Sequence, residues 1–290
     1  MIQSGLPRMN QSHRLVTRIA LVQMVSSREI EKNLSRAAVL IERAAAEQVQ
    51  AIFLPENFAA LANPSPKTIG EAEASGNGPV QQFLQQISVQ TNCWIFAGTV
   101  PVAARPDGTS ITDRRIRAAS MVFDNNGRLV ARYDKIHMFD VVVEDNQKHY
   151  VESETFEPGD HLQTVETPFG LFGLTVCYDI RFPEVYRELH KQGVRSFCIP
   201  SAFTTTTGAA HFEVLMRARA IENFCFTIAA CQGGDHDSGR KTYGNSMVVS
   251  PWGEVLARAG MGEEVITAEL DYEMQDQIRR DMPVHLQRRL

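Results

Sequence analysis

Short apolar runs rich in β-forming residues recur along the chain and predict buried strands. Arg18 to Val25, Ala51 to Leu54 and Ser196 to Pro200 are examples. Between such runs lie stretches whose apolar residues recur at helical spacing, a long example being Ser27 to Gln48. Strands and helices alternate in the first part of the chain, and hairpins are interspersed later. This order predicts an α/β layered domain with mixed sheets, because two sheets with helices outside would accommodate this many strands.

The same patterns predict the remaining elements. Further strands are expected at Cys93 to Val100, Ala119 to Asp124, Leu129 to Tyr133, Leu162 to Thr167, Leu171 to Val176, Phe224 to Cys231, Ser246 to Ser250, Val255 to Ala259 and Val265 to Leu270. Further helices are expected at Val80 to Thr91, Glu184 to His190, Ala209 to Asn223 and Tyr272 to Arg280. Asn125-Asn126-Gly127 is a hairpin signal. Residues 60–78 and 201–208 are expected to be loops, and residues 138–160 form a long irregular segment of the kind that is usually functional or disordered.

Cys177 stands where an apolar run turns polar at once. Leu171 to Val176 reads as a buried strand, and Pro183 suits the first turn of the helix that follows. A tight strand-to-helix turn exposes its side chain, and a helix N-terminus supplies free N–H groups and positive potential. Both effects favour a thiolate. The alternative is an inert core cysteine, which is the commoner fate of a free thiol.

Composition excludes several classes of partner. The chain has 290 residues, 43% hydrophobic and 22% charged, with a net charge of −5, so neither nucleic acid nor an anionic membrane is an expected partner. No apolar run of membrane-spanning length occurs. Residues 1–16 are expected to form a flexible N-terminal extension without a secretory signal, and residues 17–290 a single domain. The five cysteines are odd in number and include no C-x-x-C pair, which predicts a reduced, cytoplasmic protein without disulfides or a zinc site.

Two charged residues follow predicted strands and are candidates to assist Cys177. Glu56 comes after Ala51 to Leu54, and Lys135 comes after the strand that ends near Tyr133. If these strands are neighbours, both side chains can converge on Cys177 and supply the base and the oxyanion donor that acyl transfer requires. Taken singly, each has a structural alternative, namely a solvated carboxylate and a surface lysine.

Three blocks of sequence resemble the signature blocks of the nitrilase superfamily of carbon–nitrogen hydrolases. They are P-E-N-F at Pro55 to Phe58, Y-D-K-I-H-M-F-D at Tyr133 to Asp140, and C-Y-D-I-R-F-P-E at Cys177 to Glu184. The resemblance covers nearly the whole chain from Thr17 and implies a four-layer α-β-β-α sandwich. It also implies a catalytic triad of Glu56, Lys135 and Cys177, with Glu152 as the accessory glutamate found in many members.

The resemblance further implies an amidase that forms a thioester on Cys177. The C-terminal half looks like the branch that contains deaminated glutathione amidase and ω-amidase. We therefore expect a small carboxylate-bearing amide as substrate, deaminated glutathione first and 2-oxoglutaramate second. A non-catalytic thiol scaffold or redox-responsive protein is the alternative of a different class. No metal or organic cofactor is required, and the family usually forms homodimers or higher homo-oligomers.

Five residues are expected to contact substrate. The backbone N–H of Tyr178 follows the nucleophile directly, and Arg181 is the best candidate to pair with a substrate carboxylate, because its planar fork matches that group. The structural alternative for Arg181 is a salt bridge with Glu184 or Glu188. The others lie in the polar loop after the next strand, and are Ser201, Phe203 and Thr204.

Overall fold

Two large β-sheets form the centre of the protein. The computed structural model describes residues 16–111, 113–145 and 147–289. The first sheet has seven strands, with β6 paired to β5 beside the main path. Its strands, in spatial order, are β17 (Glu264–Asp271), β1 (Val16–Gln23), β2 (Ala51–Phe53), β3 (Trp94–Phe96), β5 (Arg117–Phe123) and β4 (Val100–Val102), with β6 spanning Leu129–Asp134.

The second sheet has six strands, with a parallel centre and antiparallel edges. In spatial order they are β16 (Val255–Arg258), β15 (Met247–Val249), β12 (Phe226–Ala229), β11 (Ser196–Cys198), β10 (Gly170–Leu174) and β9 (Gln163–Thr167). Two small hairpins lie apart from these sheets. One pairs β7 (Asp140–Val142) with β8 (His149–Val151), and the other pairs β13 (Gly233–Asp235) with β14 (Lys241–Tyr243).

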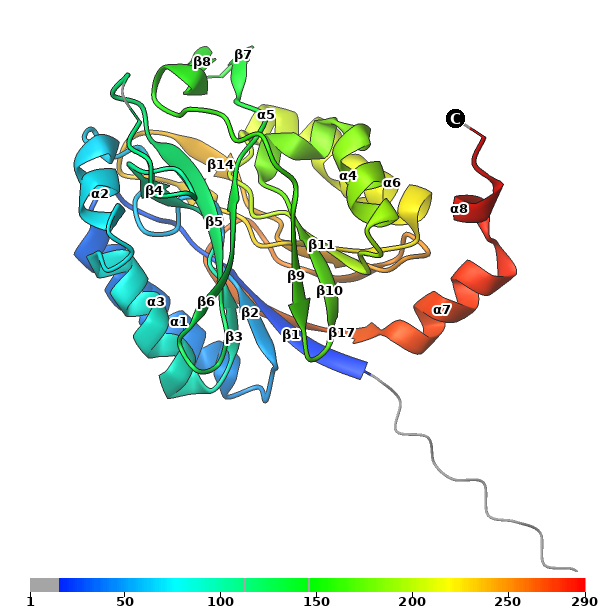
Figure 1. The fold of residues 1–290 in the computed structure, drawn as a ribbon. Coiled ribbons are helices and arrows are strands. Elements are labelled where there is room, and N and C mark those ends of the chain that lie inside the picture. Colours follow the sequence, from blue (N-terminus) through cyan, green and yellow to red (C-terminus); the bar gives the residue numbers. More distant parts are fainter. Residues whose placement is uncertain (1–15, 112, 146, 290) are drawn as a thin grey trace, which may run out of the picture.

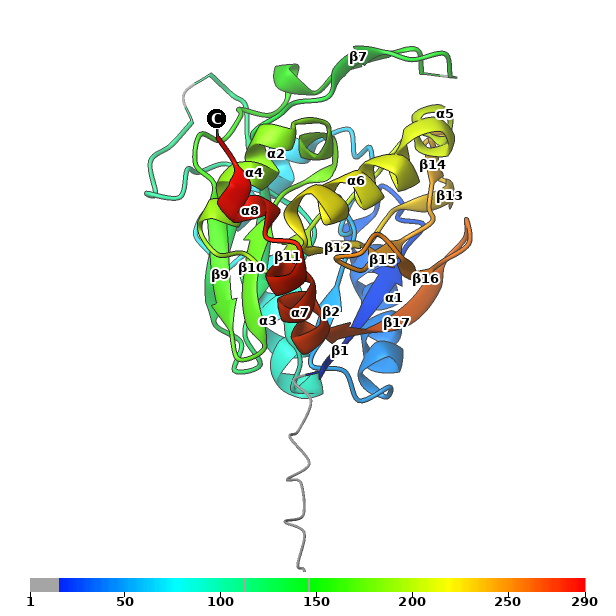
Figure 2. The same cartoon turned by 90° about the vertical axis from the view of Figure 1, so that its right-hand side faces the viewer.

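Helices cover the outer face of each sheet, which gives the expected α-β-β-α layering (Figure 1). The first sheet is covered by α1 (Ile30–Ala45) and α3 (Pro79–Thr91), with α2 (Pro66–Glu73) beside them, and the second by α4 (Pro183–Lys191) and α6 (Glu213–Asn223). The C-terminal α7 (Tyr272–Asp281) and α8 (Val284–Gln287) continue from β17, and α8 ends beside α4 (Figure 2). Shorter turns are the 3-10 helices η1 (Glu152–Glu154) and η2 (Cys177–Arg181), α5 (Thr205–Thr207) and the π-helical η3 (Gly208–Phe212).

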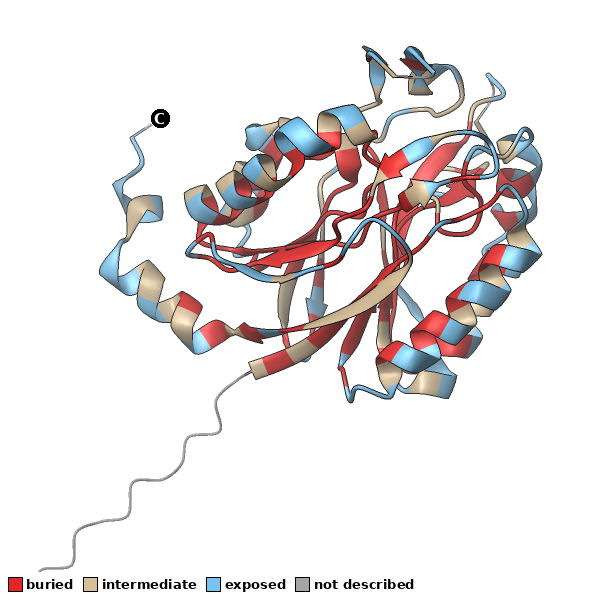
Figure 3. Ribbon diagram, turned by 180° about the vertical axis from the view of Figure 1, so that it is seen from behind, coloured by how far each residue is buried: buried red, intermediate tan, exposed pale blue. Residues whose placement is uncertain are grey.

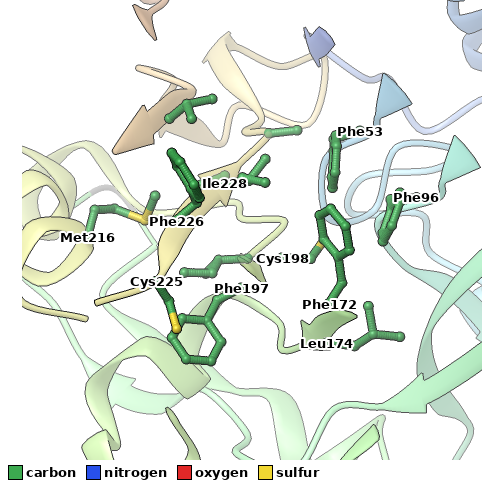
Figure 4. Packing of buried hydrophobic residues seen from close by; sticks show 14 of the residues in the cluster. Phe53, Phe96, Phe172, Leu174, Phe197, Cys198, Met216, Cys225, Phe226 and Ile228 are labelled. Carbon is green, nitrogen blue, oxygen red and sulfur yellow. The ribbon is translucent and has the colours of Figure 1, made fainter. Parts of the chain in front are cut away.

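Strand residues pack on both faces, because each sheet lies between the other sheet and a helix layer. In β1, Ile19 and Leu21 join the cluster between the sheets, whereas Ala20 and Val22 join the cluster under α1 and α3. The central strands are accordingly buried along their length, while the helices are buried on one side only (Figure 3). Between the sheets, Phe53 stacks on Phe96 with ring centroids 4.3 Å apart, and Phe172 of the second sheet lies 5.0 Å from Phe96 (Figure 4).

Two sequence predictions differ from the structure in ways that bear on the site. Residues 60–78, expected to be a loop, contain α2, which begins at Pro66 and buries Ile69. Tertiary packing here overrides a local composition rich in Pro, Ser and Gly. The single strand expected at Cys93 to Val100 is interrupted between β3 and β4, where Gly98 has a φ of +52°. The expected hairpin around Gly127 is confirmed by the pairing of β5 with β6.

The proposed N-terminal extension lies outside the described residues, except for Val16, which begins β1. In the part of the chain that the structure describes, no helix is both long and apolar enough to cross a membrane.

Candidate active site

Glu56, Lys135 and Cys177 each follow a strand, and the two sheets bring them together. Glu56 comes after β2 and Lys135 directly after β6, both in the first sheet, whereas Cys177 comes after β10 of the second sheet. Glu56, Lys135 and Cys177 retain exposed fractions of only 4%, 2% and 7%. The three side chains therefore meet at the interface between the sheets, out of contact with bulk water.

Lys135 is held between two carboxylates. Its Nζ donates to Oε1 of Glu56 at 2.9 Å and lies 2.8 Å from each carboxylate oxygen of Glu152. Burial of the ammonium lowers its pKa, but the charges of Glu152 and Glu56 outweigh that effect and hold the pKa of Lys135 well above its ordinary value. The two carboxylates thus favour the ammonium form of Lys135, which also acts on Cys177 by its charge.

Glu152 reaches the site from η1, a single 3-10 turn in the long segment that the sequence marked as irregular. Besides binding Lys135, its Oε2 accepts a hydrogen bond from the backbone N–H of Phe139 at 2.7 Å. Burial raises the pKa of the Glu152 carboxyl group, while Lys135 opposes that rise and Glu56 adds to it. Glu152 therefore ties the irregular segment to the ammonium of Lys135.

Cys177 occupies a strained backbone position at the start of η2. Its φ is +46°, unusual for a residue with a side chain, and its N–H donates to Pro200 O at 2.9 Å. Burial and the Glu56 carboxylate raise the pKa of the Cys177 thiol well above its ordinary value, against the opposing effects of Lys135 and the Ala202 backbone. The expectation that this turn favours a thiolate is therefore wrong for the resting protein, because desolvation and the Glu56 carboxylate outweigh the Lys135 ammonium and the Ala202 backbone, which favour the thiolate.

Asp179, buried two residues after Cys177, fixes this turn. Its carboxylate accepts hydrogen bonds from Val176 N at 2.8 Å, His137 N at 3.1 Å and the Tyr133 hydroxyl at 2.8 Å. Its Oδ1 also lies 2.8 Å from the Nδ1 of His137. Asp179 thus joins the turn that carries Cys177 to the segment that carries Lys135. Asp179 belongs to the third signature block, Cys177 to Glu184, but its sequence position alone indicated no role for it.

The loop that carries Glu56 passes unusually close to Gly98. A Cβ atom on Gly98 would lie 1.9 Å from the Pro55 carbonyl oxygen, so only glycine allows this approach. The next residue, Thr99, accepts a hydrogen bond from Asn57 N at 2.8 Å through its Oγ1. The interruption between β3 and β4 therefore supports the loop on which Glu56 sits.

These side chains border one cavity of about 250 Å³. Glu56, Lys135, Glu152 and Cys177 all line it, together with the aromatic rings of Phe139 and Tyr150. Within the described residues, no group of three or more His, Cys, Asp or Glu side chains is arranged to hold a metal ion. The arrangement offers a nucleophile, a carboxylate and an ammonium around one cavity, which is the set that acyl transfer requires.

The residues expected to contact substrate divide into two groups. Tyr178 and Phe203 line the cavity. Arg181 is not among the lining residues, but its guanidinium lies 5.7 Å and 5.6 Å from the centroids of the Tyr178 and Phe203 rings, so it contacts two residues that do line the cavity. Among the described residues it forms no ion pair; its guanidinium faces Nδ1 of His211 at 3.3 Å, and Glu188 pairs with Lys191 instead.

The hydroxyl groups of Ser201 and Thr204 have internal partners. Ser201 is fully buried, and its Oγ donates to Ile199 O at 2.9 Å. Thr204 caps α5 by accepting a hydrogen bond from Thr207 N at 3.2 Å. Neither residue lines the cavity. Arg240 does line it, although it was not among the candidate residues expected from the sequence. Arg240 stands in a Gly- and Asp-rich loop without a local signal that marks it, and its position is visible only in three dimensions.

Comparison with known proteins identifies the class. The family model described as "Carbon-nitrogen hydrolase" matches residues 18–280, and the chain belongs to this family. It is therefore a carbon–nitrogen hydrolase, as its signature blocks indicated.

Two named relatives and one solved structure are similar to this chain over most of its length. The chain is 38% identical over 266 residues to a deaminated glutathione amidase of Yersinia enterocolitica, covering 92% of this chain and 91% of that protein. It is 35% identical over 272 residues to omega-amidase NIT2 of Xenopus tropicalis, covering 94% and 95%. The fold matches the crystal structure of Saccharomyces cerevisiae Nit3, a member of branch 10 of the nitrilase superfamily, with a TM-score of 0.84 and 34% identity, over 95% of this chain and 97% of that one. The four-layer sandwich predicted from the sequence is confirmed.

Proposed function

We propose that this protein is a thiol amidase that hydrolyses a small carboxylate-bearing amide through a thioester on Cys177. The observation that carries the proposal is the meeting of Cys177 with the Glu56–Lys135–Glu152 cluster in one cavity. Relatives named as amidases, together with this chain's membership of the carbon–nitrogen hydrolase family, support the same reaction class.

The first half of the reaction forms the thioester. Glu56 accepts the Cys177 thiol proton as the sulfur attacks the amide carbonyl carbon. The oxyanion that forms is stabilised by the Lys135 ammonium and the Tyr178 backbone N–H. Glu56 then returns the proton to the departing amine, the carbon–nitrogen bond breaks, and the acyl group remains on the sulfur. A thiol whose resting pKa is raised needs this transfer, because little thiolate exists beforehand.

The second half of the reaction releases the acid. After the amine departs, water takes its place and gives a proton to Glu56 as it attacks the thioester carbon. Lys135 stabilises the second oxyanion as it did the first. Collapse of this intermediate breaks the carbon–sulfur bond, and the Glu56 proton returns to Cys177. The role of Glu152 is to hold Lys135 in position, since it binds the ammonium through both oxygens.

The proposed substrate carries a carboxylate on its acyl part, with deaminated glutathione first. Its hydrolysis gives 2-oxoglutarate and cysteinylglycine. Arg181 is the proposed partner of the acyl carboxylate, since it packs against two rings that line the cavity and forms no ion pair with a described carboxylate. A relative named omega-amidase supports a second candidate, 2-oxoglutaramate, whose hydrolysis releases ammonia.

Product analysis tests this function. The wild-type protein and Cys177→Ala would be assayed against a panel of amides, with separate readouts for ammonia and for released amine. We expect turnover by the wild type and none by a folded Cys177→Ala protein, because no other group there can form the thioester. Cysteinylglycine from deaminated glutathione would favour the first substrate, and ammonia alone would favour the second. Unchanged turnover by Cys177→Ala would refute the mechanism, and no turnover of any amide would favour a non-catalytic thiol protein.

Assembly and compartment belong to the same proposal. Val214 and Ile221 lie seven residues apart on α6 and, with Trp252 nearby, remain 68%, 44% and 54% exposed. Such exposed apolar side chains support self-association into a homodimer or larger homo-oligomer. All five cysteines are free, which supports a reducing, cytoplasmic location. Light scattering of Trp252→Glu against the wild type tests the first point, because an unchanged mass would exclude this face as the interface.

A further inference from the structure

Arg240 lies where the active-site cavity meets a second cavity. The second cavity, of about 510 Å³, shares four lining residues with the first, namely Ala62, Gln147, Tyr150 and Arg240. Its remaining lining includes Thr206, Ser238 and Lys241, all exposed at the surface. A substrate that extends from buried Cys177 into the second cavity therefore passes Arg240.

The guanidinium of Arg240 has unused hydrogen-bonding capacity. Its Nη2 donates to Ala202 O at 3.0 Å, and its central carbon lies 5.6 Å from the ring centroid of Tyr150. Its Nε is buried and has no hydrogen-bond partner among the described residues. A buried N–H group without a partner costs free energy until an acceptor arrives, so Arg240 is prepared for an anionic ligand.

The other charged groups that line the second cavity are already paired. Asp145 uses Oδ1 to accept hydrogen bonds from the backbone N–H groups of Gln147 at 3.0 Å and Lys148 at 2.9 Å, and Oδ2 to accept one from the Tyr150 hydroxyl at 2.8 Å. Lys241 pairs with Asp235 at 3.1 Å. Arg240 differs from both, because its buried Nε has no hydrogen-bond partner and it forms no ion pair within the described part of the chain.

We propose that Arg240 binds a carboxylate on the amine part of the substrate, the part that leaves. This inference rests on the proposed amidase function and extends it. The acyl part stays bound to Cys177 while the amine must depart first, so the end that points toward the surface cavity suits the amine. Arg181 packs against the rings of Tyr178 and Phe203, which line the active-site cavity, and remains for the acyl part. The substrate class is then an amide of an amino acid or short peptide with a free carboxylate, such as cysteinylglycine, in preference to an amide that releases ammonia.

Three substrates with the same 2-oxoglutaryl group test this assignment. The first is deaminated glutathione, the second its analogue with the terminal carboxylate converted to a carboxamide, and the third 2-oxoglutaramate. For Arg240→Gln, we expect kcat/KM to fall about 10- to 100-fold on the first substrate, as for loss of a charge-assisted hydrogen bond, and to change little on the other two. Arg240→Lys should recover part of the loss, because it keeps the charge. Lys32→Gln, on the exposed side of α1 and outside both cavities, is the control and should leave all three unchanged.

The other outcomes would overturn the assignment. An equal loss on all three substrates would mean that Arg240 holds the Ala202 peptide or the acyl part. No loss on any of them would mean that the guanidinium does not contact substrate. Failure of the proposed amidase function would give a different result, because the wild-type protein would then hydrolyse none of the three amides.

Discussion

The ammonium of Lys135 lies 2.9 Å from Oε1 of Glu56, and both side chains are almost completely buried. Glu152 binds the same ammonium through both carboxylate oxygens, so one cation serves two carboxylates at a largely buried site. Removal of a buried partner leaves the remaining charge uncompensated, which is far more costly than the loss of a surface ion pair. The same contacts that place the groups for catalysis therefore also stabilise the fold.

Neutralising either partner should abolish most activity. Glu56→Gln is expected to lower kcat by about 10²–10⁴-fold, because the variant cannot take the thiol proton. Lys135→Met is expected to lower it by about 10²–10³-fold through loss of an oxyanion donor. Steady-state kinetics on the amide that the wild type hydrolyses best would measure both effects. Wild-type kcat in either variant would remove that residue from the triad.

The stability of the Lys135 variant supplies an independent measurement. Lys135→Met leaves the buried Glu56 and the partly buried Glu152 without their shared cation, and we expect a loss of about 3–5 kcal/mol in the free energy of unfolding. Glu152→Gln added to Lys135→Met should restore part of that loss, since one carboxylate then remains. Denaturant titration of the single and double variants would show this coupling, and strictly additive effects would contradict it.

Glu152→Gln alone should have a smaller effect on catalysis than Glu56→Gln. Lys135 keeps its contact with Glu56, and a glutamine oxygen can still accept one hydrogen bond from the ammonium. We expect kcat to fall roughly 10-fold, in keeping with the loss of a charge-assisted contact. Glu154→Gln, in the same turn but exposed, is the matched control and should be unchanged. A loss as large as that of Glu56→Gln would assign Glu152 a direct part in proton transfer.

The sequence predicted the site residues that stand at strand ends. It missed those whose position in the site depends on contacts between distant segments. Glu56, Lys135 and Cys177 each follow a periodic apolar run, so their placement could be inferred locally. Glu152 lies in η1, within the segment whose sequence pattern predicted no regular element. It was identified only through the resemblance to the nitrilase superfamily. Arg240 lacks even that signal, because its significance comes from a cavity built by segments far apart in the sequence.

The thiolate expected at Cys177 is instructive for the same reason. The local turn predicted a low pKa for the Cys177 thiol. The burial that raises this pKa comes from packing of the two sheets, and the negative charge that raises it further comes from Glu56, which follows β2. Neither contribution is visible in the residues next to Cys177. The break at Gly98 is a similar case, since the close contact that demands glycine is with Pro55 of another segment.

The raised pKa of Cys177 predicts how its alkylation depends on pH. Burial and the Glu56 carboxylate raise this pKa, so the thiol stays protonated to higher pH than a free cysteine, and its iodoacetamide labelling should rise only in the alkaline range. Glu56→Gln removes one of the two causes and should shift the profile to lower pH. Peptide mass spectrometry would follow Cys177, with Cys198 as an internal control that is buried outside the cavity. A shift of the Glu56→Gln profile to higher pH would contradict this electrostatic account.

A variant of Arg181 tests whether this residue binds the carboxylate on the acyl part of the substrate. Its guanidinium packs against the rings of Tyr178 and Phe203, which line the cavity, and forms no ion pair with a described carboxylate. If it binds the acyl carboxylate, Arg181→Ala should lower kcat/KM by about 10- to 100-fold for 2-oxoglutaramate. The matched amide with a methyl group in place of the carboxylate should be a poor substrate of the wild type and should lose little further in the variant.

The control for Arg181 is Lys191→Ala at the far end of α4, where the lysine pairs with Glu188 in solvent. This change should leave both amides unaffected, because surface ion pairs contribute little. Equal losses on the two amides in Arg181→Ala would instead show that the guanidinium supports the rings of Tyr178 and Phe203 rather than selecting the substrate. A selective loss for Arg181→Ala with 2-oxoglutaramate, while Arg240→Gln leaves that substrate unchanged, would assign the acyl carboxylate to Arg181 and leave Arg240 for the amine.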